Sequence, residues 1–192
     1  MCGRYLIDDD TYSDLLLVLN TPGAVQNIAF GEIFPAAIAP VIDRGGAMAA
    51  KWGFPHWKNA GVIINARAET ALDKNMFRKP LLERRCVVPS NGFYEWNRVS
   101  GRKKGDKYLL RLPGEKMLFM AGMINIFTDA AGCEYCAFVI LTTAANDSVS
   151  PIHDRMPVIL APDERELWVG DAGFMEYVLR RPCSELASEP AY

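Results

Sequence analysis

The sequence predicts a single-domain α+β protein whose core is an antiparallel β-sheet, with a few helices at its periphery. Its 192 residues fit one domain and suffice to bury a core without disulfides or metals. Short apolar runs alternate with Gly, Pro and Asp turn signals through the middle of the chain, which is typical of a β-meander. Only a few stretches show the apolar periodicity of helices, and there is no internal repeat or linker.

The first third of the chain predicts one helix and three strands. Asp8, Asp9, Asp10 and Thr11 are residues that commonly cap helices, and the leucine cluster that follows them in the chain indicates a short buried helix. A Gly-Gly turn between two apolar runs predicts a β-hairpin. The expected elements are a helix at 12–19, a hairpin of strands 37–42 and 47–52, an irregular loop at 52–57 that contains Gly53 and Pro55, and a strand at 62–64.

The remaining two thirds predict the meander and the other helices. The stretch 75–85 is amphipathic, with a kink expected at Pro80 and a basic outward face that includes Arg84 and Arg85. The expected strands are 86–88, 93–96, 108–112, 117–123, 135–142 and 158–160, followed by helices at 163–169 and 174–181 and a tail at 182–192. The polar cluster 65–70 follows the strand 62–64, and polar groups at a strand end commonly line a site.

Charge and cysteine usage restrict the class of protein. A net charge of -2 argues against a polycation that coats nucleic acid, so any nucleic-acid contact must be a local basic patch. Five cysteines, odd in number and irregularly spaced, predict reduced thiols in the cytoplasm. The Cys133-x-x-Cys136 motif has no second pair for zinc and is interpreted as structural. No apolar run reaches the ~20 residues of a membrane span.

Cys2 is the first candidate for chemistry, because removal of Met1 would leave it as the N-terminal residue. An α-amine with a pKa near ~8 would then neighbour a thiol with a pKa near ~8.5. Such an aminothiol condenses with an aldehyde to an imine, and the thiol closes on the imine carbon to give a thiazolidine ring. By position alone, Cys2 would more commonly be an ordinary residue of a frayed terminus.

Two further residues have the chemistry of proton transfer. Glu95 shares a strand face with Phe93, and desolvation there would raise its pKa and suit it to general acid catalysis, whereas on an edge strand it would face solvent. His153, beside charged neighbours, has a side chain whose unperturbed pKa near ~6.5 allows proton shuttling at neutral pH. The aromatic residues Phe54 and Trp57 either stack on bases or fill the core.

Five blocks of the sequence together resemble the SOS response-associated peptidase (SRAP) family, also called abasic site processing proteins. The blocks are Met1-Cys2-Gly3-Arg4, Trp52-Gly53, Asn65-Ala66-Arg67-Ala68-Glu69-Thr70, Gly92-Phe93-Tyr94-Glu95-Trp96 and His153-Asp154-Arg155-Met156-Pro157. The resemblance runs from residue 2 to about 170. It implies a strongly curved, barrel-like antiparallel sheet and an N-terminal cysteine at a positively charged groove for single-stranded DNA. The implied substrate is an abasic site, whose open sugar carries an aldehyde at C1′.

The resemblance also implies roles for individual residues. Cys2 would be the covalent nucleophile, Asn65 would orient the opened sugar, His153 would open the sugar ring and Glu95 would serve imine formation, with the last two roles exchangeable. The residues expected to bind DNA are Arg4, Arg67 and Arg155 on phosphates and Trp57 or Phe54 against bases. The implied protein is a cytoplasmic monomer, nucleoid-associated on damaged DNA, that uses no metal or cofactor.

Two departures and two alternatives accompany this interpretation. Family members commonly carry an Asn-x-Ala-Pro element where this chain has Glu32-Ile33-Phe34-Pro35, and the chain ends early, without the usual final strand. The alternatives to a thiazolidine crosslink are an N-terminal-nucleophile thiol peptidase, at least one that removes its own first residue, and a non-covalent single-strand binding module that uses Arg4, Arg67 and Trp57.

Overall fold

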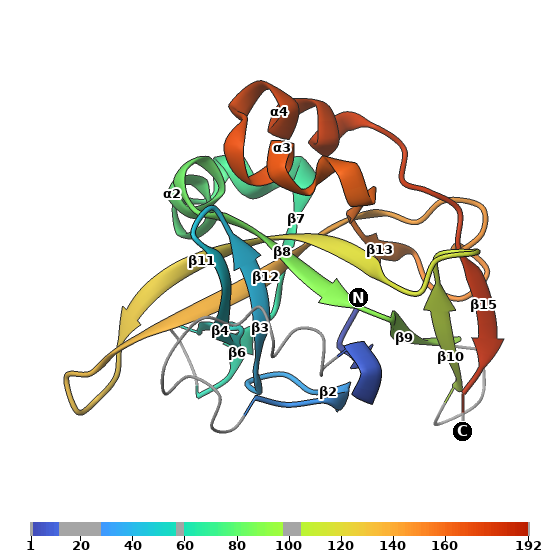
Figure 1. The fold of residues 1–192 in the computed structure, drawn as a ribbon, viewed down its shortest axis with the longest axis horizontal. Helices are drawn as coiled ribbons and strands as arrows, with labels where there is room; N and C mark the ends of the chain where they lie inside the picture. Colours follow the sequence, from blue (N-terminus) through green and yellow to red (C-terminus); the bar gives the residue numbers. More distant parts are fainter. Residues whose placement is uncertain (1, 12–27, 57–59, 98–104, 192) are drawn as a thin grey trace.

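The computed structural model describes residues 2–11, 28–56, 60–97 and 105–191. These residues form an α+β fold in which two main sheets contribute to a shared core and a few helices lie on one side (Figure 1). The predicted fold class is therefore confirmed. No helix of the described residues is long and apolar enough to span a membrane.

The first sheet is antiparallel and carries the start of the chain. Its strands, in spatial order, are β15 (Ala187–Pro190), β10 (Asp106–Arg111), β9 (Gly92–Asn97), β1 (Arg4–Ile7) and β2 (Gly31–Ile33). In its register, Arg4 lies opposite Tyr94 and Tyr5 lies opposite Phe93. The sheet thus brings the first residues of the chain beside the strand that carries Glu95.

The second sheet is a closed barrel with three attached strands. The barrel strands are β12 (Glu134–Ala144), β4 (Gly46–Trp52), β3 (Ile38–Asp43), β8 (Arg85–Ser90) and β11 (Leu118–Thr128), and β11 pairs back onto β12. The attached strands are β7 (Asn65–Arg67), β13 (Arg155–Pro157) and β14 (Ile159–Leu160). Unlike the other pairs, β12 runs parallel to β4 and β7. These strands are not joined by hairpins, so chain connectivity does not force an antiparallel direction.

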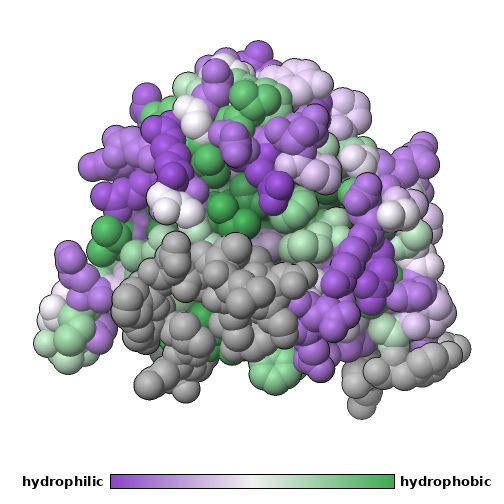
Figure 2. All heavy atoms as spheres, viewed as in Figure 1, coloured by the Kyte–Doolittle hydropathy of each residue, from purple (hydrophilic) through white to green (hydrophobic). Residues whose placement is uncertain are grey.

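Apart from the helical residues 9–11 near the N-terminus, the helices of the described residues gather above the barrel in the view of Figure 1. They are the 3-10 helices η1 (Ala68–Asp73) and η2 (Pro162–Glu164) and the α-helices α2 (Asn75–Glu83), α3 (Arg165–Gly170) and α4 (Ala172–Arg180). Figure 2 shows hydrophilic side chains around these helices and a band of apolar side chains across the middle of the same face. The capping role of Asp8 is confirmed, since its Oδ1 accepts the Thr11 N–H at 2.8 Å. The helix predicted at 12–19 lies outside the described residues.

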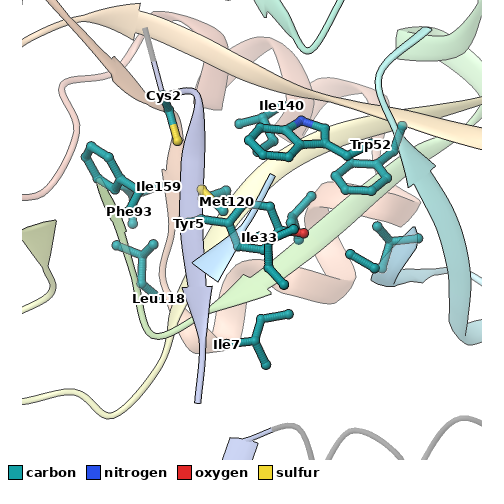
Figure 3. Close-up of a cluster of buried hydrophobic side chains, with 14 of the residues drawn as sticks. Cys2, Tyr5, Ile7, Ile33, Trp52, Phe93, Leu118, Met120, Ile140 and Ile159 are labelled. Carbon is teal, nitrogen blue, oxygen red and sulfur yellow. The ribbon is translucent and has the colours of Figure 1, made fainter. Parts of the chain in front are cut away.

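The core consists of two clusters on opposite faces of the barrel strands. In β8, Cys86 and Val88 belong to the first cluster and Val87 to the second; in β12, Ile140 belongs to the first and Val139 to the second. Both faces are covered, so these strands have continuous apolar sequences instead of the alternation seen in half-exposed strands. Figure 3 shows the first cluster, with the Cys2 sulfur turned toward its buried side chains.

The loop predicted at 52–57 contains a short strand. Gly53 adopts φ +117°, and a Cβ there would lie 2.7 Å from the Val62 Cβ. Glycine therefore permits a bend after β4, and the chain then forms β5 (Phe54–Pro55), paired with β6 (Val62–Ile63). Pro55 is tolerated because this ribbon has only two strands, so each is an edge strand.

The basic face predicted for 75–85 is also corrected. The α-helix ends at Glu83, and Arg85 is 3% exposed as the first residue of β8. Its guanidinium donates to the carbonyl oxygens of Leu81 and Leu82 at the end of α2 and to that of Trp168 in α3. Arg85 is buried because helix carbonyl oxygens satisfy its donors, which no local periodicity indicates.

The predicted C-terminal tail contains the last strand of the first sheet. β15 pairs with β10, with Leu109 opposite Glu189 and Leu110 opposite Ser188. β10 is therefore not an open edge, because residues 187–190 cover it.

Candidate active site

Four predicted residues come together where the first sheet meets the barrel. Cys2 precedes β1, Asn65 begins β7, Glu95 lies in β9 and His153 precedes β13. They belong to four separate segments of the chain, and two direct contacts link them in pairs.

Cys2 is a buried thiol at the entrance to β1. Its side chain is 0% exposed, and Sγ lies 3.6 Å from the Arg4 carbonyl oxygen. Burial raises the pKa of the Cys2 thiol well above its ordinary value, and the nearby Glu95 carboxylate raises it further. The thiol is therefore protonated at neutral pH, and any reaction at sulfur requires a base beside it.

Asn65 holds the backbone of Cys2. Its Nδ2 donates to the Cys2 carbonyl oxygen at 2.9 Å, and β7 is itself placed by parallel pairing with β12, where Asn65 lies opposite Ile140. Its Oδ1 is buried and accepts no hydrogen bond from the residues that the structure describes. The amide oxygen therefore retains an acceptor position beside Cys2.

Glu95 is buried, as the strand periodicity predicts. The residue is 3% exposed, and its strand lies in the middle of the first sheet, which excludes the edge-strand alternative. Burial raises the pKa of the Glu95 carboxyl above its ordinary value, although the nearby His153 opposes this shift. A carboxylic acid with a raised pKa can donate a proton near neutral pH.

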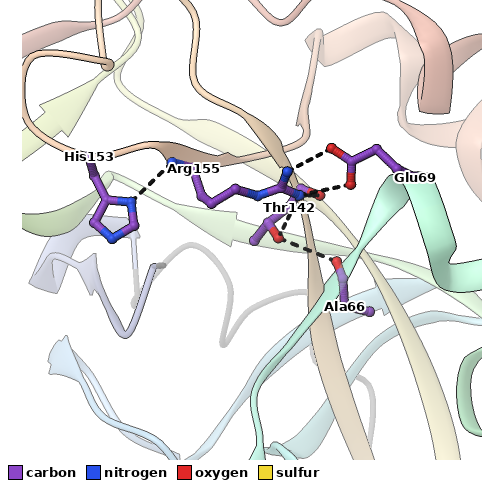
Figure 4. Close-up of polar contacts among 5 residues, drawn as sticks. All are labelled: Ala66, Glu69, Thr142, His153 and Arg155. Atoms are coloured by element: carbon purple, nitrogen blue, oxygen red, sulfur yellow. Dashed lines mark hydrogen bonds and ion pairs between the residues drawn. The ribbon is translucent and has the colours of Figure 1, made fainter.

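His153 faces Glu95 with one nitrogen and the backbone with the other. Its Nε2 lies 3.9 Å from Glu95 Oε2, and its Nδ1 accepts the Arg155 N–H at 3.0 Å (Figure 4). Accepting that bond leaves the proton of neutral His153 on Nε2, toward Glu95. Asp154 Oδ1 also lies 2.8 Å from Nδ1.

The Arg155 side chain is occupied by the fold, in contrast to its expected contact with phosphate. The guanidinium is 13% exposed and binds both oxygens of Glu69, at 2.7 and 2.9 Å, and the Thr142 carbonyl oxygen at 2.7 Å (Figure 4). Its hydrogen bond is the leading cause that lowers the pKa of Glu69. Arg155 therefore ties β13 to η1 and β12 and supports the N–H that reaches His153.

The other predicted DNA contacts differ in their availability. Arg67 is exposed, and the Arg4 side chain is 38% exposed. Phe54 is fully buried, with its ring centroid 5.0 Å from that of Phe127, so the structure corrects its expected contact with bases. Trp57 lies outside the described residues.

A groove of about 580 Å³ begins at two of the predicted residues. It runs from Asn65 and Arg67 in β7 to Lys74 and to Met76 and Phe77 in α2. A larger cavity of about 710 Å³ between Arg44 and Glu166 contains none of the predicted site residues. The chemistry of Asn65 and its neighbours therefore favours the smaller groove as the approach to the site.

Sequence patterns missed a cluster of charged and aromatic residues on the same sheet. Glu32 lies between Arg4 and Lys107, and Phe34 packs on Arg4. The only signal in the sequence is the Glu32-Ile33-Phe34-Pro35 departure from the family element, whose consequence depends on pairing across strands. Among the described residues, no group of three or more His, Cys, Asp or Glu side chains is arranged to hold a metal ion.

The family model described as "SOS response associated peptidase (SRAP)" matches residues 1–186. The Bacillus subtilis abasic site processing protein YoaM is 37% identical over 184 residues, which cover 88% of this chain and 79% of that protein. YoqW, also an abasic site processing protein of that organism, is 32% identical over 88% of this chain and 80% of that protein. Escherichia coli YedK, also so named, is 37% identical over 62% and 52%.

Solved structures share the fold. A protein from Bacteroides thetaiotaomicron superposes with a TM-score of 0.84 at 22% identity, covering 100% of this chain and 92% of that one. A protein from Bordetella bronchiseptica gives a TM-score of 0.79, also at 22% identity, with 100% of both chains covered. At these identities the similarity establishes the arrangement of the strands and helices.

Proposed function

The chain belongs to the SOS response associated peptidase (SRAP) family, and on that premise we propose that it recognises abasic sites in single-stranded DNA and links to them covalently. The link is a thiazolidine formed by the α-amine and thiol of Cys2 after removal of Met1. The relatives named abasic site processing proteins support the substrate. The observation that carries the proposal is the hydrogen bond of 2.9 Å from Asn65 Nδ2 to the Cys2 carbonyl, beside the Glu95–His153 pair.

The reaction requires proton transfers that the site can supply. The α-amine of Cys2 adds to the C1′ aldehyde, and loss of one water gives an imine. The raised pKa of Glu95 increases the fraction of its carboxyl that is protonated, and this form donates the proton with which that water leaves. Because Glu95 supplies that proton, the imine nitrogen keeps its own. The resulting carboxylate takes the thiol proton of Cys2, and sulfur adds to the carbon of the protonated imine to give the neutral ring. One water is lost overall.

The buried thiol fits this order of steps. Because burial raises its pKa, the Cys2 thiol does not react indiscriminately, and it becomes a nucleophile only when the Glu95 carboxylate forms beside it. His153 serves the opening of the sugar ring, in which the ring oxygen gains a proton and the C1′ hydroxyl loses one to give the aldehyde. The roles of His153 and Glu95 are separable by variants of each.

The approach of DNA is assigned to the groove that starts at Asn65. Arg67 and Lys74 line it beside Phe77, which combines cations for phosphates with an aromatic ring for a base. Such contacts hold the strand without reading its sequence. Arg4, two residues after Cys2 in the chain, is a further cation for phosphate, with a side chain that is 38% exposed.

The test is adduct formation with an abasic oligonucleotide. Intact mass measurement first establishes that Met1 is absent from the purified protein. That protein should then form a denaturation-stable adduct with abasic single-stranded DNA, and Cys2→Ser should form none that survives without borohydride reduction. Lack of an adduct, or an equal adduct with Cys2→Ser, would refute the thiazolidine. Peptide turnover blocked by iodoacetamide, without an adduct, would instead identify a thiol peptidase.

A further inference from the structure

A set of charged and aromatic side chains lies on the face of the first sheet opposite Glu95. The register places Arg4 opposite Tyr94, Lys107 opposite Trp96 and Leu6 opposite Glu32. Since side chains alternate along a strand, these residues share one face, whereas Glu95 and Phe93 point to the other. We call this set the Glu32 cluster: Arg4, Glu32, Phe34, Tyr94, Trp96 and Lys107.

One carboxylate bridges two cations at the centre of the cluster. Glu32 Oε1 lies 2.9 Å from Arg4 Nη1, and Oε2 lies 2.8 Å from Lys107 Nζ. Burial would raise the pKa of Glu32, but hydrogen bonds from Lys107 and Arg4 lower it below its ordinary value. Glu32 is therefore ionised at neutral pH, and each of its oxygens holds one cation.

The two cations are also fixed against aromatic rings. Arg4 Cζ lies 4.3 Å from the Phe34 ring centroid and 5.2 Å from that of Trp96. Lys107 Nζ lies 4.0 Å from the Tyr94 centroid. Phe34 is 47% exposed, so the stack opens to solvent. Cations packed on aromatic rings, of which Phe34 is open to solvent, form a surface suited to a single nucleic-acid strand, in which phosphates alternate with bases.

A carboxylate that bridges two cations makes the same kind of contact with them as a phosphate would. Both groups present two oxygens to neighbouring donors, and both form charge-assisted hydrogen bonds with Arg and Lys. We propose that Glu32 is an internal competitor of a DNA phosphate, which must displace its carboxylate from Arg4 and Lys107 in order to bind there. The inference rests on the proposed function and concerns the regulation of that site.

Competition of this kind makes the time that a DNA strand stays bound to the protein depend on whether it contains an abasic site. A strand without an abasic site is held only weakly at the cluster, because each phosphate that binds there replaces an existing ion pair. A strand with an abasic site is retained by the bond to Cys2. The carboxylate therefore shortens the time spent on undamaged DNA without preventing capture of the lesion.

The test measures non-covalent binding of an intact single-stranded oligonucleotide, which has no aldehyde. Glu32→Gln keeps the shape of the side chain and removes the competing charge, so its affinity in fluorescence anisotropy should rise about 5- to 10-fold. The slope of log affinity against log salt should steepen by about 0.7 for each additional phosphate that the variant binds. Glu189→Gln is the matched control, because Glu189 pairs with Arg111 at 3.2 Å in the same sheet and the net charge changes equally.

Each outcome decides the inference. Tighter binding and a steeper slope for Glu32→Gln alone support it. Equal changes in both variants indicate a general charge effect and overturn it, and unchanged or weaker binding shows that Glu32 positions the two cations instead. If Cys2 forms the adduct but Glu32→Gln does not change DNA binding, the inference is overturned while the proposed function stands. If no variant binds DNA at low salt, the proposal that DNA is the partner is overturned as well.

Discussion

Glu95 shows how much of a site residue can be inferred from its immediate neighbours. The two-residue period of a strand places it beside Phe93, and the structure confirms that it is buried, with a raised pKa. The same reasoning does not apply to Arg85, whose sequence context is basic but whose donors are satisfied by carbonyl oxygens of two helices. A buried charge is predictable when its burial follows from the strand and unpredictable when it depends on distant partners.

Substitution of Glu95 should change how stability depends on pH. Because the pKa of Glu95 is raised in the folded state, the protonated form favours folding, and this contribution is lost as pH rises through the folded pKa. Glu95→Gln mimics the protonated form at every pH. Its thermal midpoint should therefore exceed that of the parent by more at about pH 8 than at about pH 5.

Calorimetry of both proteins at the two pH values checks this result. The same variant should lose crosslinking activity, since an amide cannot donate the proton or accept it from Cys2. A midpoint difference that is equal at both pH values would contradict burial of an ionisable group at this position.

At the scale of elements, the site depends on short strands that are held by side chains. β7 and β13 each have three residues, and Arg155 joins β13 to β12 and to η1 through Thr142 and Glu69. The sequence alone indicates a loop around residue 155, because three residues are too few for a pattern. Their strand character comes from pairing with β12, where Met156 lies opposite Thr143.

The Glu69–Arg155 pair should therefore position His153 without touching the substrate. Glu69→Gln removes the charge that holds Arg155, and we expect loss of the Nδ1 hydrogen bond and an adduct-formation rate about 10-fold lower. Binding of intact DNA should remain within about twofold, because Arg155 has little exposed surface. Nitrogen chemical shifts of His153 should report a mixture of tautomers in place of the Nε2–H form.

Two comparisons make this prediction specific. Glu176→Gln breaks an exposed ion pair with Arg180 in α4 and should leave both the rate and the tautomer unchanged. Glu69→Asp, which retains the charge, should recover part of the rate. A Glu69→Gln variant with a normal rate of adduct formation, or with a slower rate but an unaltered His153 tautomer, would show that Arg155 does not position His153.

At the scale of the whole molecule, both core clusters share the same strands. Adjacent residues of β8 and β12 point into opposite clusters, so neither cluster can be lost while the other keeps its strands. Trp52 belongs to the first cluster and Trp168 to the second, and both are fully buried. The Trp168 Nε1–H also donates to the Cys86 carbonyl oxygen at 2.9 Å, which ties α3 to the barrel.

The described fold should therefore unfold in one cooperative transition. Urea unfolding followed by far-UV circular dichroism and by tryptophan fluorescence should give the same midpoint, and a Trp168→Phe variant should report the same agreement from the remaining tryptophans. Separate midpoints would show that the helices and the barrel are independent units, and would contradict the single domain predicted from the length of the chain.

The sequence by itself determined the local properties of this protein: where most strands lie, the glycine that permits the bend after β4, the side of β9 on which Glu95 lies, and the motifs that indicate the family. Each follows from residues within a few positions of one another. The tertiary structure alone decided which segments meet. Asn65 reaches Cys2 across 63 residues, through parallel pairing of β7 with β12, and Glu32 bridges Arg4 and Lys107, 28 and 75 residues away. Such contacts depend on closure of the sheets, and no local period of the sequence specifies that closure.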